Sequence, residues 1–254
     1  HGIVWSAGEG FYQLLMPDNR SGCYPVYPGD SDDPDSDMNI MLKIQNLSIN
    51  IDLKAILSNI HLECTPGSLT GIIGPNGAGK SSLLRAIVGI WHPNSGQIDY
   101  QQQSLFLLSG KKRAQILTYL PQNMLYEKGH RVDEFILLAN HPWRGVPERS
   151  NLEQRLQEAL TICNIEHLRD RYLHTLSGGE KQRVFLAQVV FQDTPVILLD
   201  EPTTFLDFKH VLHIEDVLKY LLNKRKIILC VTHDLYMAQH LSTHILALKN
   251  GNTY

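Results

Sequence analysis

The chain has 254 residues and a formal net charge of −3, with 23 lysines and arginines against 26 aspartates and glutamates. This length suits one or two domains with an ample core. The charge balance, without a basic tract, leaves no electrostatic footprint for nucleic acid, so we expect no nucleic-acid partner. No apolar run approaches the roughly 18 residues that a membrane-spanning helix needs. These properties are typical of a soluble cytosolic enzyme.

Residues 1–37 differ in composition from the rest of the chain. Segments rich in Gly, Pro and Tyr precede an acidic tract from Asp30 to Asp37, and such a composition favours disorder. We expect a disordered or non-native extension, with Met38 or Met41 as the natural start. The sequence leaves open whether the extension is genuine, artificial or the product of upstream read-through. One folded domain is predicted over residues 38–254.

Short apolar runs predict strands ahead of the first glycine-rich segment. From Leu42 to Ile73 the apolar residues alternate or cluster, as in an antiparallel sheet that feeds the core. Leu69 to Ile73 form the last apolar strand before the glycines. A helix is expected over residues 80–88, and Gly89 is a suitable stop for it.

The glycine-rich segment fits the phosphate-binding pattern G-x-x-x-x-G-K-[ST], with Lys80 and Ser81 directly after its last glycine. Its backbone N–H groups can surround phosphate oxygens, and the following helix points its positive end at them. Lys80 adds a cation for the β- and γ-phosphates, and the Ser81 hydroxyl can ligate Mg²⁺. A plain glycine-rich turn is the alternative, but the Lys-Ser pair and the preceding apolar strand argue against it. The residues expected to contact nucleotide are Gly74, Pro75, Asn76, Gly77, Ala78, Gly79, Lys80, Ser81 and Ser82.

A helical insert is expected between about residues 124 and 175. It follows residues 104–117, which lead toward a strand that ends at Gln122. Ser150 and Glu153 have the spacing of a capping box. An apolar stripe behind this box repeats at helical spacing and predicts the core face of a small subdomain. The stripe consists of Leu152, Leu156, Leu160 and Cys163.

Two carboxylates follow the strongly apolar run from Val196 to Leu199. Such a run suits a strand buried on both faces of a parallel sheet, and carboxylates at its end are costly to bury unless they meet a cation. Asp200 fits the metal-side carboxylate of a phosphate-loop NTPase, and Glu201 is placed to polarise an attacking water. Without the phosphate loop, a solvated acidic turn would be the better interpretation.

A second helix terminus and a histidine narrow the class of NTPase. Ser177, Gly178 and Gly179 precede a helix predicted from Glu180 to Gln192, so the N-terminus of that helix can bind another anion. A kinase or small GTPase has no use for such a second site. His233 follows the apolar strand Ile-Ile-Leu-Cys-Val-Thr, and in this order of motifs we expect it to be functional.

Together with Leu-Pro-Gln, these runs resemble those of the ATP-binding subunits of ABC transporters, and the resemblance covers about Met41 to Tyr254. It implies an α/β fold, in which a P-loop NTPase (RecA-like) core carries an N-terminal antiparallel β subdomain and an inserted helical subdomain. It also implies ATP and Mg²⁺ as cofactors and a head-to-tail dimer with a second ATPase subunit. In that dimer, Ser177, Gly178 and Gly179 of one subunit close on the γ-phosphate held by the other.

The resemblance assigns roles one position at a time. Gln122 resembles the glutamine that senses Mg²⁺ and water and reports to the membrane subunit. Glu201 is the expected catalytic carboxylate, and His233 resembles the switch histidine that contacts the γ-phosphate. Lys80 would hold charge in the transition state. The expected metal-site residues are Ser81, Gln122 and Asp200.

Four positions depart from the family pattern. Ile51 stands where the family stacks adenine on an aromatic ring, so we expect weaker or less base-selective nucleotide binding. Glu180 replaces the usual Gln and adds charge where the helix dipole favours it. The loop at Asp207 resembles the family loop that crosses the dimer interface, but Thr204 and Phe205 replace small residues, which predicts different local packing.

The chain ends shortly after a strong turn signal. Ile245 to Lys249 is a predicted strand, Asn250 and Gly251 are typical of a hairpin turn, and Asn252 to Tyr254 remain for the return strand. Family members generally continue further, so we expect a domain that is truncated at its C-terminus.

Finer resemblance points to the importers of iron chelates, haem and cobalamin, in the runs Leu108-Ser109, Ala139-Asn140-His141-Pro142 and Thr203 to His210. It implies ATP hydrolysis that powers import through a polytopic membrane permease, with a solute-binding protein as an indirect partner. The subunit would then be peripheral, on the cytoplasmic face of the inner membrane. The solute never touches such a subunit, so the sequence does not name it.

Two alternatives stay open. A soluble ABC ATPase of DNA repair or translation would need a long coiled-coil insertion or a second cassette, and the sequence has neither. A catalytically impaired binding or assembly subunit is disfavoured by the expected catalytic residues, although Ile51 and the short C-terminus keep it in view.

Overall fold

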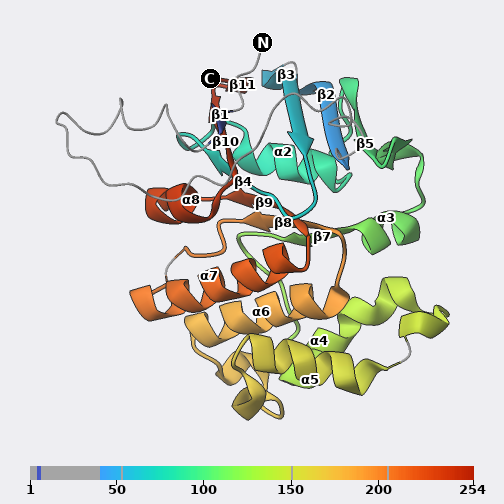
Figure 1. Ribbon diagram of the computed structural model, residues 1–254, viewed down its shortest axis with the longest axis vertical. Coiled ribbons are helices and arrows are strands. Elements are labelled where there is room, and N and C mark those ends of the chain that lie inside the picture. Colours follow the sequence, from blue (N-terminus) through green and yellow to red (C-terminus); the bar gives the residue numbers. More distant parts are fainter. Residues whose placement is uncertain (1–4, 7–40, 53, 150, 205) are drawn as a thin grey trace.

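The computed structural model describes residues 5–6, 41–52, 54–149, 151–204 and 206–254 (Figure 1). The strands are β1 (Trp5–Ser6), β2 (Leu42–Ile51), β3 (Lys54–Cys64), β4 (Leu69–Ile73), β5 (Ser95–Tyr100), β6 (Gln103–Ser104), β7 (Leu117–Leu120), β8 (Val196–Asp200), β9 (Ile227–Val231), β10 (His244–Lys249) and β11 (Asn252–Thr253). The α-helices are α2 (Lys80–Ile87), α3 (Gly110–Ile116), α4 (Val132–Leu137), α5 (Leu152–Ile162), α6 (Gly178–Gln192), α7 (Phe208–Asn223) and α8 (Leu235–Leu241). Short 3-10 helices are η2 (Leu105–Leu107), η3 (Leu138–Trp143), η4 (Pro147–Arg149), η5 (Glu166–Leu168) and η6 (Leu173–Thr175).

A central sheet with the strand order β1-β10-β4-β9-β8-β7 forms the middle of the molecule, and β11 also pairs with β10. The neighbours from β10 to β7 run parallel. Every residue of β8 and β9 is buried, as expected for parallel strands covered on both faces. Along β8, Val196 and Leu198 belong to one apolar cluster, and Ile197 and Leu199 belong to the other. The sheet therefore separates two hydrophobic cores.

The first core lies between the central sheet and a smaller antiparallel sheet of order β3-β2-β5-β6. Helix α2 lies between the two sheets (Figure 1). Its Leu83 and Leu84 are fully buried among apolar residues of both. This packing fixes the start of α2, and hence the phosphate loop, against the central strands.

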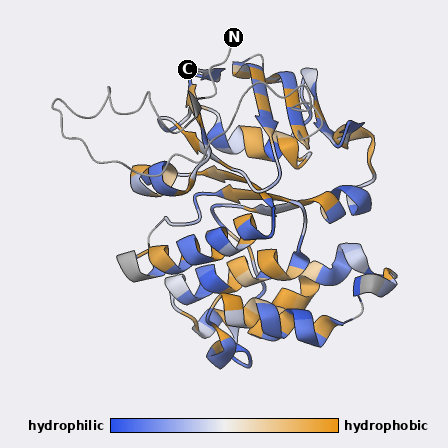
Figure 2. Ribbon diagram, viewed as in Figure 1, coloured by the Kyte–Doolittle hydropathy of each residue, from blue (hydrophilic) through white to orange (hydrophobic). Residues whose placement is uncertain are grey.

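The second core lies on the opposite face, under a layer formed by α4, α5, α6 and α7 (Figure 1). The apolar stripe predicted for the insert packs here, with Leu156, Leu160 and Cys163 buried and Leu152 partly buried. Figure 2 shows the hydrophobic residues of these helices gathered on the surfaces that face one another. The predicted α/β fold, with its β subdomain and helical insert, is thus confirmed.

Several predicted boundaries agree with the structure, and one does not. The strand from Leu69 to Ile73 is β4, and α2 ends at Ile87, before Gly89 at a φ of 82°. The predicted end of the next strand, at Gln122, is wrong by two residues, because β7 ends at Leu120. Pro121 follows, and it has no N–H for a further ladder bond.

The capping box expected from Ser150 and Glu153 stays a prediction. Ser150 lies outside the described residues, and Asn151 is the residue that precedes the first turn. The Glu153 carboxylate accepts N–H groups from both terminal nitrogens of the Arg169 guanidinium, at 2.7 and 2.9 Å. This side chain therefore links α5 to the segment after η5.

The hairpin predicted at Asn250 and Gly251 is present. Asn250 has a φ of 50° and Gly251 a φ of 78°, and the turn pairs Leu248 with Thr253. Residues Trp5–Ser6, which fall in the expected extension, form β1 and pair antiparallel with β10. The remainder of residues 1–37 lies outside the described residues, so its disorder stays a prediction, as does C-terminal truncation.

Candidate active site

A cavity of about 670 Å³ opens at the carboxyl ends of the central strands. The phosphate loop joins β4 to α2 there, and the chain leaves β8 and β9 at the same edge. Ligands of open α/β sheets bind at this edge. The lining residues are Lys54, Ile56, Asn76, Gly77, Ala78, Gly79, Lys80, Ser81, Ser82, Trp91, Gln122, Glu201, Thr204 and His233.

Two glycines of the phosphate loop are required by their surroundings. Gly74 has a φ of 148°, and a Cβ there would lie 2.1 Å from the carbonyl oxygen of Leu248. Gly79 has a φ of 100°, and a Cβ would lie 2.6 Å from Cδ2 of Leu57. Any larger residue would force the loop away from β10 or β3, so the loop keeps its curved path only with glycine.

Lys80 lies within the curve of this loop. Its ammonium donates to the carbonyl oxygens of Gly74, at 2.8 Å, and Pro75, at 3.1 Å. Burial lowers the pKa of Lys80, while the nearby Glu201 and Asp200 carboxylates act in the opposite direction. The two carbonyls fix the position of the cation beside the loop amides, as phosphate binding would require.

Asp200 is 2% exposed at the end of β8. Its Oδ1 accepts the Ser81 hydroxyl at 2.8 Å, and its Oδ2 accepts the Tyr119 hydroxyl at 3.2 Å. Burial raises the pKa of Asp200, and the two hydroxyl donors partly offset this rise. The structure thus brings together Ser81 and Asp200, which lie far apart in the sequence.

Glu201 is the centre of the polar cluster opposite the phosphate loop. Its Oε2 accepts from the Gln122 amide at 2.7 Å and from the Thr204 hydroxyl at 2.9 Å. Its Oε1 lies 3.0 Å from Nε2 of His233. Glu201 itself has a φ of 54°, an uncommon conformation for a residue other than glycine, of a kind that gathers at functional sites.

The Ser177–Gly179 segment begins α6 and is not among the residues that line the cavity. Ser177 caps the helix. Its hydroxyl accepts from the Glu180 N–H at 3.3 Å and donates to the Glu180 carboxylate at 2.8 Å, and its own N–H donates to the same carboxylate at 2.8 Å. These hydrogen bonds lower the pKa of Glu180. Glu180 therefore completes a capping box, which rigidly fixes the first turn.

Sequence reasoning missed several residues of this region. Tyr119 and Thr204 bind the two carboxylates, and Lys54 and Ile56 line the cavity. Ile51, aligned with the adenine-stacking position, is 37% exposed at the end of β2 and is not among the lining residues. In the sequence, only the position of Tyr119 and Thr204, each three residues from a motif residue, indicates that their hydroxyls could belong to the site.

The phosphate loop and the paired carboxylates at the end of β8 define a P-loop nucleoside triphosphatase. A family model described as ABC transporter matches residues 57–204. The chain is 35% identical over 219 residues to the hemin import ATP-binding protein HmuV of Pseudomonas entomophila, a match that spans 84% of this chain and 85% of that protein. It is 32% identical over 216 residues to the probable siderophore transport system ATP-binding protein YusV of Bacillus subtilis. That match spans 84% of this chain and 78% of that protein.

Solved structures agree with these matches. The dimeric structure of MJ0796, a bacterial ABC transporter cassette, is similar with a TM-score of 0.75 at 28% identity, over 84% of this chain and 96% of that one. A post-hydrolysis structure of the same cassette, bound to ADP and Pi, also has a TM-score of 0.75. The chain belongs to the ABC transporter family and is an ATPase that binds ATP.

In the part of the chain that the structure describes, no helix combines the length and apolar character needed to cross a bilayer. One of the two relatives is named for hemin import and the other for siderophore transport.

Proposed function

We propose that this ATPase powers the import of an iron chelate, haem or cobalamin-type solute through a membrane permease. The observation that carries the catalytic part is the convergence of Gln122, Glu201 and His233 opposite the phosphate loop. The hemin and siderophore systems named for its relatives support the class of solute.

Magnesium is the proposed metal cofactor. Ser81 and Asp200 present oxygen donors 2.8 Å apart, and oxygen is the ligand that Mg²⁺ prefers. A carboxylate that is 2% exposed also gains from a nearby cation. Gln122 would complete the protein ligands. When bound, the ion would supply positive charge against the β- and γ-phosphate oxygens.

The remaining residues act on ATP and water. Lys80 and the backbone N–H groups of the loop hold the phosphate chain. The loop residues that would contact it are Gly74, Pro75, Asn76, Gly77, Ala78, Gly79, Ser81 and Ser82, of which Pro75 has no N–H to donate. Glu201 orients the attacking water and accepts its proton, and His233 fixes the γ-phosphate during in-line attack. Three hydrogen bonds reach the two oxygens of Glu201 among the described residues. A carboxylate has about four lone-pair positions, so one position on Oε1 is left for the water.

Dimerisation completes the site in this proposal. Ser177, Gly178 and Gly179 of a second, head-to-tail subunit would close on the γ-phosphate, using the N–H groups at the start of α6. The similarity to a dimeric cassette supports this arrangement. The subunit would be peripheral, on the cytoplasmic face of the inner membrane. Its opening after hydrolysis would drive a polytopic permease, which would receive solute from a binding protein.

The test of the catalytic assignment is Glu201→Gln. The amide keeps the shape of the side chain but cannot accept a proton, so we expect ATP binding to persist and turnover to fall by at least about 100-fold. The variant should also accumulate a closed dimer with ATP, measured by phosphate release and by size-exclusion chromatography. Glu127→Gln, at a side chain that is 87% exposed, is the matched control.

Near-normal turnover of Glu201→Gln would contradict the role of Glu201. A wild-type protein that binds ATP without turnover would instead favour an impaired assembly subunit. The solute class has a separate test. ATPase activity of the reconstituted transporter should rise with a binding protein loaded with an iron chelate, haem or cobalamin, and stimulation by an unrelated solute would contradict it.

A further inference from the structure

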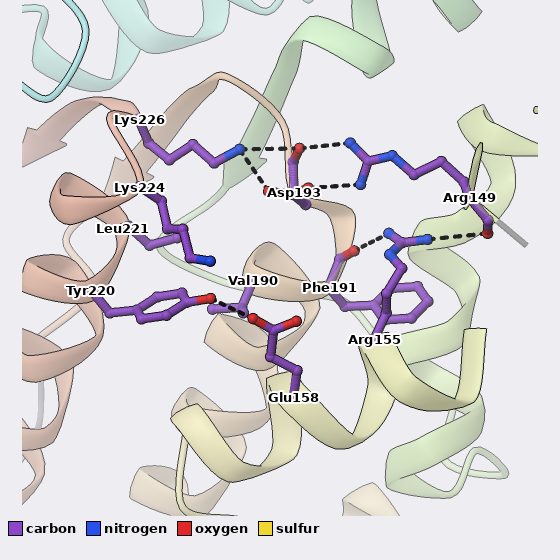
Figure 3. A pocket seen from close by; sticks show the side chains of 10 residues that line it. All are labelled: Arg149, Arg155, Glu158, Val190, Phe191, Asp193, Tyr220, Leu221, Lys224 and Lys226. Carbon is purple, nitrogen blue, oxygen red and sulfur yellow. Dashed lines mark hydrogen bonds and ion pairs between the residues drawn. The ribbon is translucent and has the colours of Figure 1, made fainter. Parts of the chain in front are cut away.

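A second cavity, of about 350 Å³, lies at the opposite end of α6 from Ser177 (Figure 3). It is bounded by α5, by the end of α6 and by the segment that joins α7 to β9. Four cationic side chains line it, together with two carboxylates. The cations are Arg149, Arg155, Lys224 and Lys226, and the carboxylates are Asp193 and Glu158.

Both carboxylates already have partners. Oδ2 of Asp193 accepts from Arg149 at 2.8 Å, and its Oδ1 lies 2.6 Å from the ammonium of Lys226. Glu158 accepts the Tyr220 hydroxyl at 2.7 Å. Asp193 thus balances part of the charge of two cations, and the Glu158 carboxylate is oriented by Tyr220.

The other two cations have no carboxylate partner among the described residues. Arg155 donates to the carbonyl oxygen of Phe191 and to that of Arg149. The Lys224 ammonium lies 5.5 Å from the centre of the Tyr220 ring, and Figure 3 shows it directed into the cavity between α7 and α5. Burial lowers the pKa of Arg155, and the charge of Arg149 adds to that effect.

The charge and size of this cavity select a class of ligand. Four cations against two carboxylates leave a formal excess of two positive charges. Guanidinium and ammonium groups that converge from several elements are typical of phosphate recognition. The volume lies at the lower end of the roughly 300–1,000 Å³ found for ligand pockets. A small dianion fits both properties.

We propose that the cavity beside Asp193 binds a small phosphate-type dianion, either inorganic phosphate or a phosphomonoester, through Arg155 and Lys224. The site is separate from the phosphate loop. Its cavity shares no lining residue with the phosphate-loop cavity. The bound anion joins α5, in the helical insert, to α7 beside the central sheet, and therefore holds the insert against the core.

A purely structural network is the competing explanation, and it predicts different behaviour. If the cations only tie α5 to the core, added phosphate acts through ionic strength alone. Replacing Lys224, which has a ring contact and no described ion pair, would then change no ligand affinity. Specific binding of phosphate and its loss on substitution at Lys224 separate the two explanations.

The experiment uses the full chain saturated with Mg²⁺ and a non-hydrolysable ATP analogue, which occupies the phosphate loop. Inorganic phosphate, glycerol phosphate and chloride of equal ionic strength are titrated by calorimetry and by thermal melting. At ten times the dissociation constant, we expect phosphate or glycerol phosphate to raise Tm by about 3–6 °C beyond chloride. A response to glycerol phosphate alone identifies a monoester site, and a response to both identifies the phosphate group as the ligand.

Three variants place the site. Lys224→Gln should weaken phosphate binding by about 10-fold or more, and Lys224→Arg, which keeps the charge, should retain it. Lys112→Gln removes the same charge from an exposed position on α3 and should have no effect. A chloride response equal to that of phosphate would overturn the proposal, and so would phosphate binding that is unchanged in Lys224→Gln or equally weakened in Lys112→Gln.

Discussion

At the scale of single residues, His210 sets a limit on what can occupy the start of α6. Its ring is held by Asp207, whose Oδ1 lies 2.6 Å from Nδ1. A Cβ added to Gly179 would lie 2.4 Å from Cδ2 of that ring. The second glycine of Ser-Gly-Gly therefore leaves room for the His210 ring within this subunit, whatever it contacts in a second one.

Gly179→Ala should destabilise the protein by about 1–3 kcal/mol through overpacking. His210→Ala should cost little alone, and the double variant should recover most of the loss because the clash is removed. Urea denaturation of the four proteins measures this coupling. Strictly additive effects would show that the ring does not press on Gly179.

His244 gives the stability of the protein a dependence on pH. It is half-buried in β10, and burial lowers its pKa from 6.5. A pKa below the unfolded value means that the fold disfavours the charged ring. The contribution of His244 is complete above about pH 6.5 and is lost as the pH falls through the folded pKa. His244→Gln should reduce the fall in Tm between about pH 7.5 and 5.5, whereas the exposed His92→Gln should not.

Motif residues could be predicted from the sequence because each carries its own chemistry and spacing. The fixed spacing of Lys80 and Ser81 from the glycines is one example, and the carboxylates after β8 are another. The hydrogen-bond partners of those residues could not be predicted from the sequence. Tyr119 reaches Asp200 across 81 positions, and such a contact depends on strand order, which local patterns do not encode.

At the scale of elements, the turn between β10 and β11 supports the phosphate loop. The Gly251 N–H donates to the carbonyl oxygen of Ala78 at 3.1 Å, and the Gly251 carbonyl accepts from the Ser58 N–H at 2.8 Å. A Cβ on Gly251 would lie 2.4 Å from the carbonyl oxygen of Ile56. The turn was predictable from Asn-Gly, but its contact with the loop required knowledge of where β10 lies in the sheet.

Gly251→Ala should destabilise the protein by more than about 2 kcal/mol, because a positive φ and a backbone overlap both oppose the methyl group. It should also weaken ATP binding, since the hydrogen bond to Ala78 is displaced. Asn250→Gly is the control, because glycine accepts a φ of 50° without strain. Calorimetric ATP titrations and melts measure both effects. An unchanged ATP affinity would separate the turn from the loop.

At the scale of the whole molecule, the strands of the central sheet contribute side chains to both cores. Loss of apolar contacts on either face should therefore lower the free energy of unfolding of the whole domain. Leu198 is fully buried toward α2, and Leu198→Ala should cost about 2–5 kcal/mol. Leu125→Ala, at a residue that is 92% exposed, should change stability by less than about 0.5 kcal/mol. Urea unfolding monitored by circular dichroism tests both. The apolar runs predicted these buried strands, but not which face each residue meets.

The hydrogen bond from the Gly251 N–H to the carbonyl oxygen of Ala78 also makes the phosphate loop sensitive to force on the β10–β11 turn. Strand β11 is held to β10 by two residue pairs and by a hydrogen bond from the Tyr254 N–H to the carbonyl oxygen of Ala247, at 2.9 Å. Tension applied at Tyr254 would therefore separate this short strand before it opened either core. Peeling would withdraw the Gly251 amide from the phosphate loop and slacken the curve around Lys80. Force applied at Tyr254 would therefore lower the affinity for nucleotide, while the rest of the fold remained intact.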